Sequence, residues 1–504
     1  MTPPPGRLDF SFSFAADGTE AKERPATGVG HVVFIAPYSG AAKSSTATSV
    51  LTARPLELGE VFRIVPSAIR LEPLTAGSEP CLLPFVDSDS LHPDALLDTV
   101  PSLMELWEPL RDLHCDPRAA ARLAAMVTSI EVDERGTKPG PESKRSSDDE
   151  TIGDVGAAST SREAEGSLLD RLLGKRPAEA CLADTPPSGG VSIAASQRLV
   201  QTFAERVLSE ESTTMQSRAL ENSSYLQTKA TAELARRLRA LLRQDAFQNV
   251  SGSWLATEMV VRSCPDESRA RFSAADASWT ELVSTPMKFE ALLDSGVSVV
   301  MVDHCFRAES DELSGLVALV RACHEHRVFF VAGAAPSLAG LEERFLDDPF
   351  GTKHDVEAWQ KGWSDEARES WGQLAALREQ GAQFALVLPR CLVRHPYGKH
   401  GEPIEKFAFE EFEDRPESAQ FLWANGAYLV ARALMEQWCG KEVQMDGSFE
   451  IGGLPVVNVP DVNGRRIQPP LEFSLHRSAV DQLLDQGFSI VEARSDSDRA
   501  RVYV

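Results

Sequence analysis

Hydrophobic and polar positions alternate with two different periods along this 504-residue chain. Residues 8–14 read LDFSFSF, and the strict alternation places Leu8, Phe10, Phe12 and Phe14 on one face of a strand. The polar, Gly- and Pro-containing stretch that follows offers no hairpin partner. Because a strand with one aromatic face invites aggregation as a bare edge, it needs a sheet to join, in its own chain or in another.

The next part of the chain predicts a small α/β unit at residues 29–131, preceded by an arm and tether at 1–28. Its apolar strand-like segments are 31–36, 61–71 and 81–86, and its helical patterns are roughly 93–110 and 117–130. The first helix follows His92-Pro93-Asp94, where a proline suits the first turn and an acidic residue suits the positive end of the helix dipole.

Residues 132–195 predict a flexible linker. Their first part, 132–166, has no aromatic side chain, so it buries too little surface to offset the entropy cost of ordering. Within the linker, residues 167–175 (SLLDRLLGK) predict a short amphipathic helix. Its apolar stripe consists of Leu168, Leu169, Leu172 and Leu173. Such a helix either docks on a partner or packs back on the body.

Residues 196–504 predict a larger domain of the α/β class, with α+β parts. After a helical region at about 195–245, apolar strands alternate with helices. The strands are 297–302, 328–332, 384–388 and 501–504, and the helices are 311–325, about 355–380, about 418–438 and 477–486. This alternation indicates parallel β-α-β units, and therefore a mixed, partly parallel sheet flanked by helices.

The composition predicts a soluble, cytoplasmic protein without nucleic-acid binding or membrane insertion. Its formal charge of −24 repels phosphate backbones and anionic lipid. Its eight cysteines are far apart and form no C-x-x-C pair, which is typical of reduced thiols. The start of the chain has no apolar signal segment, and the apolar runs are shorter than the ~18 residues of a membrane span.

We predict no catalytic, cofactor-binding or metal-binding residue. GAAKSS at 40–45 lacks the glycine frame of a phosphate-binding loop. Asp303-His304-Cys305 ends a strand, but neighbouring strand residues point to opposite faces and cannot form a relay. His324 and His326 have no third ligand nearby.

The segment LPRCLVRHPYG (388–398) contains two arginines four positions apart among apolar residues and prolines. Arg390 and Arg394 predict structural ion pairs with carboxylates such as Glu405, Glu410 or Glu411, and Glu410 is the partner that we name. The alternative is an anion-binding loop in a cytosolic α/β enzyme.

This segment, with FAFEEF (407–412) and LWANGAYLVARAL (422–434), resembles the large subunit of the type VI secretion contractile sheath. That family carries L-P-R-x-L-x-R-x-P-Y-G, then F-x-F-E-E, then L-W-x-N-A-A-Y at similar spacing. Further upstream, DAFQNVSGSWL (245–255), VVMVDHCF (299–306) and VFFVAGAAPSLAGL (328–341) are similar to other segments of the family in the same order.

The first 130 residues resemble the small subunit of the same sheath. The similar segments are RLDFSFSF at the N-terminus, LTARPLELGEVFRIVPSAIRL (51–71) and residues 83–113. The resemblance therefore implies two subunits fused in one chain. The helix at 167–175 is similar to the segment through which a hexameric AAA+ unfoldase recognises contracted sheaths.

The chain departs from the family pattern in three respects. Ser251 and Leu255 replace a glutamate and an arginine around the early tryptophan, so an ion pair is lost. The unfoldase-type helix is internal rather than N-terminal. The chain stops at Val504, where the large subunit usually continues into a region that supplies strands shared between protomers.

The resemblance implies a structural subunit without an active site or cofactor. It would assemble by strand exchange into a helical tube whose contraction propels an inner tube. Its implied partners are other sheath subunits, the inner-tube protein, the unfoldase and the baseplate. Two alternatives stay open: a non-polymerising adaptor or sheath-end protein, and the enzyme with an Arg390/Arg394 anion site.

Overall fold

The structure is a computed structural model, and parts of the chain lie outside its description. The described residues are 30–40, 54–55, 67–75, 79–113, 115–136, 223–264, 270–341, 353–354, 356, 359–399, 401–412, 416–438, 447–460, 466–467, 469–493 and 497–504. The chain divides into two compact units, residues 1–119 with 229–504, and residues 120–228. Each unit is described by itself.

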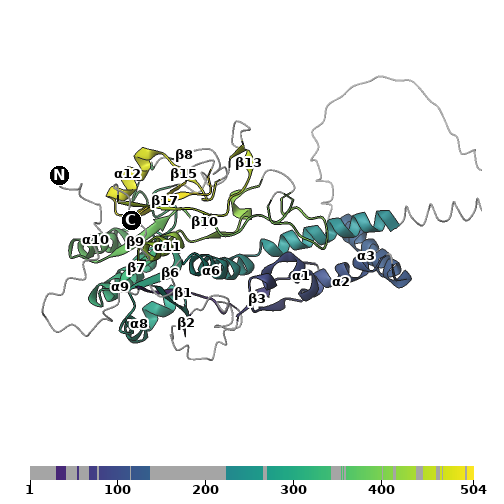
Figure 1. The fold of residues 1–504 in the computed structure, drawn as a ribbon, viewed down its shortest axis with the longest axis horizontal. Helices are drawn as coiled ribbons and strands as arrows, with labels where there is room; N and C mark the ends of the chain where they lie inside the picture. Colours follow the sequence, from purple (N-terminus) through teal and green to yellow (C-terminus); the bar gives the residue numbers. More distant parts are fainter. Residues whose placement is uncertain are drawn as a thin grey trace, which may run out of the picture. The chain divides into compact units, whose positions relative to one another are not determined.

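The first unit is built on a nine-stranded sheet (Figure 1). Its strands, in spatial order, are β12 (Ser448–Ile451), β17 (Ala500–Tyr503), β16 (Ser489–Ala493), β9 (Phe384–Leu388), β7 (Phe329–Ala334), β6 (Val299–Phe306), β1 (Gly30–Ala36), β5 (Ala270–Asp276) and β2 (Arg54–Pro55). All neighbours from β16 to β5 pair in parallel, and the remaining pairs are antiparallel. The predicted α/β class, with a mixed and partly parallel sheet, is confirmed.

Helices connect and cover these strands. They are α1 (Pro93–Thr99), α2 (Pro101–Arg111), α3 (Pro117–Gly136), α6 (Asp245–Arg262), α7 (Trp279–Ser284), α8 (Pro286–Leu293), α9 (Ser310–Glu325), α10 (Asp365–Glu379), α11 (Ala427–Trp438) and α12 (Arg477–Asp485). A further helix covers residues 223–242. Short strands pair outside the main sheet: β3 (Ser67–Leu71) with β4 (Cys81–Phe85), β10 (Cys391–Leu392) with β11 (Trp423–Ala424), β13 (Val459–Pro460) with β14 (Arg466–Ile467), and β15 (Ser474–Leu475) with β8 (Lys353–His354).

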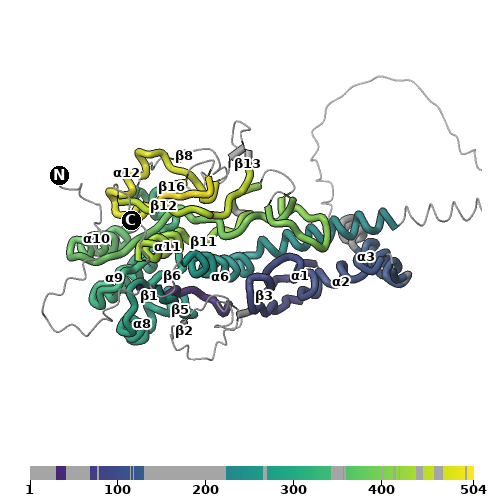
Figure 2. Tube along the Cα trace, viewed as in Figure 1, coloured from purple at the N-terminus to yellow at the C-terminus, as the bar shows by residue number. Residues whose placement is uncertain are grey.

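The position of β1 differs from the sequence prediction. Figure 2 shows this strand, in purple, among teal strands from much later in the chain. Gly30 lies opposite Ala270, and Val32 lies opposite both Phe272 and Val299. The unit predicted at 29–131 is therefore not a separate body, because its first strand is central to the large sheet. An almost continuous apolar run fits a parallel strand covered on both faces, but such a run does not reveal which strands flank it.

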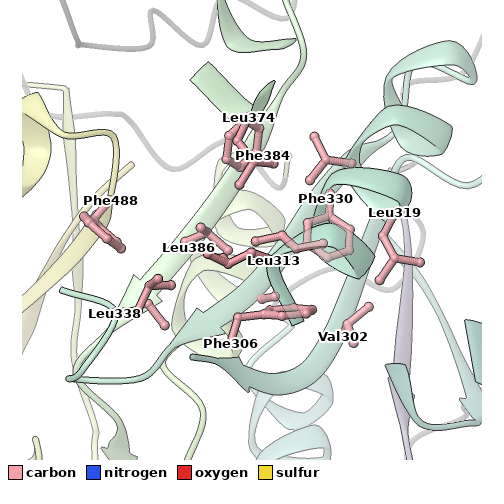
Figure 3. Close-up of a cluster of buried hydrophobic side chains, with 14 of the residues drawn as sticks. Val302, Phe306, Leu313, Leu319, Phe330, Leu338, Leu374, Phe384, Leu386 and Phe488 are labelled. Carbon is pink, nitrogen blue, oxygen red and sulfur yellow. The ribbon is translucent and has the colours of Figure 1, made fainter. Parts of the chain in front are cut away.

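Both faces of the sheet are covered by apolar side chains. On one face, residues of α9, α10 and α12 pack on alternate strand residues, including Phe306, Phe330, Phe384 and Leu386 (Figure 3). On the other face, the ring of Phe34 stacks on Tyr428 of α11, with ring centroids 5.9 Å apart. This two-sided burial explains why the strands read as continuous apolar runs instead of alternating ones.

Three helices differ from the sequence predictions, and one of them, predicted at about 355–380, begins only at Asp365. The predicted helix at 93–110 is two helices, because Val100 is extended (φ −89°, ψ 115°) in front of Pro101, which starts α2. A residue before proline is disfavoured in the helical region. The predicted helix at 418–438 begins only at Ala427, and a 3₁₀ turn (Ser418–Gln420) and β11 precede it.

The second unit is described only in part. It contains the remainder of α3 and the first residues of the helix at 223–242. The predicted helix at 167–175 and the N-terminal arm at 8–14 lie outside the described residues. Within the part of the chain that the structure does describe, no helix combines the length and apolar character needed to cross a bilayer.

Candidate functional site

The arginine segment leaves the sheet at the end of β9 and crosses to the α1 region. A cis peptide bond joins Leu388 to Pro389, and β10 follows immediately. β10 pairs with β11, the short strand just before α11 in the chain, and this pairing fixes the start of the segment. The two arginines therefore lie in an irregular stretch that is fixed at its start by backbone pairing.

Arg390 forms a two-point ion pair with Glu472. Its Nη2 and Nε atoms donate to the two carboxylate oxygens at 2.6 and 2.9 Å. The Glu472 side chain is 2% exposed, whereas that of Arg390 is 43% exposed. Burial alone would lower the pKa of Arg390, but the hydrogen bonds and charge of Glu472 outweigh it and raise the pKa. Glu472 lies 82 residues further along the chain.

Arg394 forms the more buried pair. Its two Nη atoms donate to the oxygens of Glu411 at 2.8 and 2.9 Å, and both side chains are at most 10% exposed. The backbone N–H of Tyr397 donates to the same carboxylate at 2.7 Å, and the guanidinium lies 4.0 Å from the centre of the Tyr397 ring. Burial opposes the charged form, yet Glu411 outweighs it and raises the pKa of Arg394.

Glu410, the partner named from the sequence, has a different role. Its Oε1 accepts a hydrogen bond from the backbone N–H of Lys399 at 3.1 Å. Its backbone oxygen accepts one from Nε of Arg239 at 3.0 Å. The Glu410 carboxylate lies against the backbone of Gly398 and Lys399, whereas the Glu411 carboxylate faces Arg394. The sequence contains both glutamates but no signal for which one turns inward.

A second set of contacts joins this segment to α1. The Asp94 carboxylate accepts hydrogen bonds from the backbone N–H groups of Glu405 (3.0 Å) and Lys406 (3.1 Å). The ammonium group of Lys406 donates to the backbone oxygen of Asp94 at 2.7 Å and also contacts Asp98. Asp94 was predicted only as a helix-start residue, and sequence spacing gave no sign of these contacts across more than 300 residues.

The helix at 223–242 makes the third connection to this region. Arg237 donates to Glu233 at 2.8 Å and to the backbone oxygen of Ser102 in α2 at 2.7 Å. Gln244, just after this helix, exchanges two hydrogen bonds with the backbone of Glu72. The first part of the chain is thus fastened to the rest by charged and polar contacts as well as by β1.

The strand end at Asp303-His304-Cys305 contains a buried polar cluster. The Asp303 carboxylate accepts hydrogen bonds from the hydroxyls of Ser253 (2.6 Å) and Tyr428 (3.0 Å). His304 instead contacts Glu312 at 3.2 Å. Burial raises the pKa of Asp303, and it raises the pKa of Cys305 to about 12. The three side chains do not form a relay, as the alternation along a strand predicts.

The other candidate positions add no chemistry. His326 contacts Asp294 at 3.1 Å, and no cluster of three or more metal-ligating side chains occurs among the residues that the structure describes. The strand-arm residues and the leucines of 167–175 lie outside the description, as does most of GAAKSS. Since carboxylates already occupy both arginines of the segment, an external anion would have to displace Glu472 or Glu411.

The geometry defines a braced α/β domain, in which ion pairs and strand pairing hold distant segments of the chain together. Residues 295–503 match the family model VipB, described as EvpB/VC_A0108, tail sheath N-terminal domain. The chain is also 23% identical over 333 residues to the type VI secretion system sheath protein TssC1 of Pseudomonas aeruginosa. That alignment covers 61% of this chain and 65% of the relative. The first comparison relates residues 295–503 to a tail sheath domain, and the second relates the chain to a type VI secretion sheath protein.

Proposed function

We propose that this chain is a structural subunit of a type VI secretion-like contractile sheath. The observation that carries the proposal is the match of residues 295–503 to a tail sheath domain. This match includes the arginine segment and its partner Glu472. The two ion pairs of this segment, which join it to Glu472 and Glu411, support a structural role.

We further propose that the chain fuses a small-subunit-like part to a large-subunit-like part. The place of β1 supports this, because the first part of the chain supplies a central strand to the sheet of the second part. The contacts of Asp94 with Glu405 and Lys406 support it as well. A fusion of this kind keeps the two parts in equal amounts in every assembled copy.

Assembly would proceed by strand exchange through the arm at Leu8, Phe10, Phe12 and Phe14. Addition of an extended segment to a sheet edge gains main-chain hydrogen bonds and leaves the linked bodies free to rotate and slide. A head-to-tail contact that does not close generates a helical polymer. Contraction of such a tube would propel an inner tube, with the energy stored in packing.

No reaction is required by this function. The occupied guanidinium groups of Arg390 and Arg394 argue against the alternative of an enzyme with an anion site, because binding would break a buried ion pair. A cytoplasmic location follows from the proposed role. The partners would be other sheath subunits, the inner-tube protein and the baseplate.

Sedimentation and negative-stain electron microscopy test the assembly. The full-length chain is compared with a variant that lacks residues 1–16, each alone and co-expressed with a separate sheath homologue. We expect large particles from the full-length chain and loss of these particles on deletion. Monomers in every arm of the experiment would refute the assembly proposal.

We also propose that Leu168, Leu169, Leu172 and Leu173 dock on a hexameric AAA+ unfoldase. A pull-down with Leu169→Asp tests this, with Asp170→Ala as the matched control on the same segment. Loss of the unfoldase in the first variant alone is the expected result. Equal capture by both variants would remove this partner. Unfoldase capture without particles from the intact chain would instead favour the adaptor alternative.

A further inference from the structure

The Asp303 carboxyl group joins the sheet to two helices. It lies near the end of β6, and the hydroxyl groups of Ser253 in α6 and Tyr428 in α11 both contact its Oδ2 atom, at 2.6 and 3.0 Å. The side-chain amide of Asn425, just before α11, also hydrogen-bonds the carboxyl group. Tyr428 is 0% exposed and Ser253 is 6% exposed, so little water reaches this junction. The hydrogen-bond partners of Asp303 are thus neutral groups in a dry surrounding.

The two hydroxyl groups have alternative acceptors. The Ser253 hydroxyl also lies 2.9 Å from the backbone oxygen of Asn249, and the Tyr428 hydroxyl lies 3.3 Å from that of Ser253. A hydroxyl group has one proton, so each donates either to Asp303 or to a carbonyl of α6. When Asp303 is protonated, its O–H can donate to a hydroxyl oxygen, and that hydroxyl then donates to its carbonyl. Rotation of hydroxyl groups alone therefore accommodates a proton on Asp303.

The ionisable groups around Asp303, among the described residues, do not supply it with a positive charge. The charged side chains of this region are directed at one another: His304 at Glu312, Arg390 at Glu472, and Arg432 at Glu436. Burial raises the pKa of the tyrosines and thiols near the cluster, which keeps them uncharged at neutral pH: Tyr38, Tyr428, Cys305 and Cys391. Asp276, at the end of β5, adds a second carboxylate near Tyr38. An ionised Asp303 thus loses hydration without gaining a counter-ion in this part of the structure.

The same two helices position β1. Tyr38 follows β1 by two residues, and its hydroxyl lies 2.7 Å from that of Thr257 in α6. Its backbone oxygen accepts a hydrogen bond from Nε1 of Trp254 at 3.2 Å. In β1 itself, Phe34 stacks on Tyr428 of α11. A change at Asp303 therefore acts on the elements that hold the first part of the chain against the sheet.

We propose that Asp303 is a proton-operated joint, which holds α6 and α11 on the sheet when its carboxyl group is protonated and loosens both helices when the group ionises. Burial raises the pKa of Asp303 in the folded chain. The closed joint therefore binds the proton more tightly than the open one, and it opens more readily as the pH rises through this pKa. The inference concerns the folded chain itself and does not depend on the proposed function.

Infrared spectroscopy of the full chain over a series from pH 4 to 8 tests the protonation. A protonated carboxyl group has a carbonyl stretching band that the carboxylate lacks, and subtraction of the spectrum of Asp303→Asn isolates the band of Asp303. We expect this band to disappear with a midpoint above the ordinary aspartate pKa of about 3.9. Tyr428→Phe removes one hydroxyl donor to the carboxylate, so it should move the midpoint to a higher pH.

Hydrogen exchange over the same series, corrected for the intrinsic effect of pH on exchange, tests the joint. We expect the amides of α6 and α11 to lose protection as the pH rises, while those of β7 keep theirs. The loss approaches about tenfold for each unit that separates the folded and unfolded pKa of Asp303. Asp303→Asn should remove this dependence on pH. Asp276→Asn, at the end of β5, is the matched control and should retain it.

Three results would overturn the proposal. A midpoint at or below the ordinary value would mean that the folded chain does not favour the proton on Asp303. Protection of α6 and α11 that does not change with pH would mean that the proton does not operate the joint. An equal loss in β7 would mean that the whole fold responds. Circular dichroism checks that Asp303→Asn is folded; if it is not, the difference between the unmodified chain and Tyr428→Phe gives the infrared result.

Discussion

Arg394 and Glu411 face each other through two parallel hydrogen bonds of 2.8 and 2.9 Å, in a position where both side chains are almost fully buried. Glu411 also accepts the backbone N–H of Tyr397. The pair therefore fixes the turn of the chain that follows the sheet, and each member depends on the other to offset its loss of hydration.

Removal of one member should destabilise the protein more than removal of both. We expect Glu411→Gln or Arg394→Met to lower the free energy of unfolding by about 3–5 kcal/mol, because one buried charge stays unpaired. The double variant should lower the free energy of unfolding by less than the sum of the losses in the two single variants. Urea unfolding and a double-mutant cycle measure this. The exposed pair Arg368–Asp365 is the control, with an expected loss below about 1 kcal/mol. Additive losses at Arg394 and Glu411 would contradict the coupling.

Asp303 should make stability dependent on pH. Burial raises its pKa in the folded protein above the ordinary value of 3.8 for an aspartate, although hydrogen bonds from Ser253, Tyr428 and Asn425 oppose this. The folded state thus binds the proton more tightly. This tighter proton binding stabilises the folded protein fully at a pH below the pKa of Asp303 in the unfolded chain. The stabilisation is lost as the pH rises through the pKa of Asp303 in the folded protein.

The variant Asp303→Asn keeps an oxygen that can accept the bonds from Ser253 and Tyr428 and removes the charge. We expect its stability relative to the unmodified protein to increase as the pH rises above about 4. Denaturant unfolding over a pH series measures this difference. Asp365→Asn, at a side chain that is 98% exposed, is the control. A difference that stays constant with pH would show that Asp303 has no raised pKa.

Gly487 should tolerate no side chain. Its φ is +92°, and an added Cβ would lie 1.5 Å from Nη1 of Arg378. That guanidinium donates to the Gly487 oxygen at 2.7 Å and lies 4.3 Å from the centre of the Phe384 ring, so it has little room to move. Gly381 has the same φ of +92° but an open surrounding.

Thermal unfolding of Gly487→Ala and Gly381→Ala separates the cost of a side chain at positive φ from the cost of its clash with Arg378. Gly381→Ala should cost about 1 kcal/mol for the backbone conformation alone. Gly487→Ala should cost a further 1–3 kcal/mol, roughly, because the ring, the guanidinium and the turn must shift. Equal losses would indicate that Arg378 moves away freely.

Asp94 should hold residues 405–406 against α1. Asp94→Ala leaves the backbone N–H groups of Glu405 and Lys406 without their acceptor, at a cost of about 1–3 kcal/mol. Hydrogen exchange should accelerate at these two amides before it does at β9. Asp98→Ala, which removes only the partly exposed contact with Lys406, serves as the control. Unchanged exchange in the Asp94 variant would exclude this fastening.

The thiol of Cys305 should be unreactive. Burial raises the pKa of Cys305 and of Cys391 to about 12, whereas Cys115 is exposed. Because the thiolate is the reactive form, a maleimide should modify Cys115 before Cys305 and Cys391, which should react only after unfolding. Mass spectrometry of peptides gives the order. Rapid labelling of Cys305 in the folded protein would contradict this prediction.

Much of the local structure could be predicted from the sequence. The apolar runs that become β6, β7 and β9, and the amphipathic pattern of α9, mark their own positions because hydrophobic periodicity is a local property. The opposite orientation of neighbouring residues 303–305 is local as well. The presence of Pro101 after Val100 contained the signal for the break between α1 and α2, although the apolar spacing across it suggested one helix.

The sequence predicted that the candidate site contains ion pairs, but it did not predict which residues form them. Two arginines among apolar residues indicate paired charges, because an unpaired buried guanidinium is costly. Their partners could not be read in the same way. Glu411 and Glu410 are neighbours of the same type, and Glu472 is far along the chain. The sequence around Asp94 is typical of a helix start, and it gave no indication that the Asp94 carboxylate also accepts hydrogen bonds from residues 405–406.

The sequence by itself determined the positions of several strands and helices, among them β6, β7, β9 and α9, together with the excess of acidic charge and the one-sided aromatic pattern of residues 8–14. Only the tertiary structure decided that β1 lies between β5 and β6, and that Glu472 and Glu411 pair with the two arginines of the segment. The physical reason is that the hydrophobic periodicity of a segment depends on which of its own faces are buried. The residues of a parallel strand do not indicate which other strands pair with it.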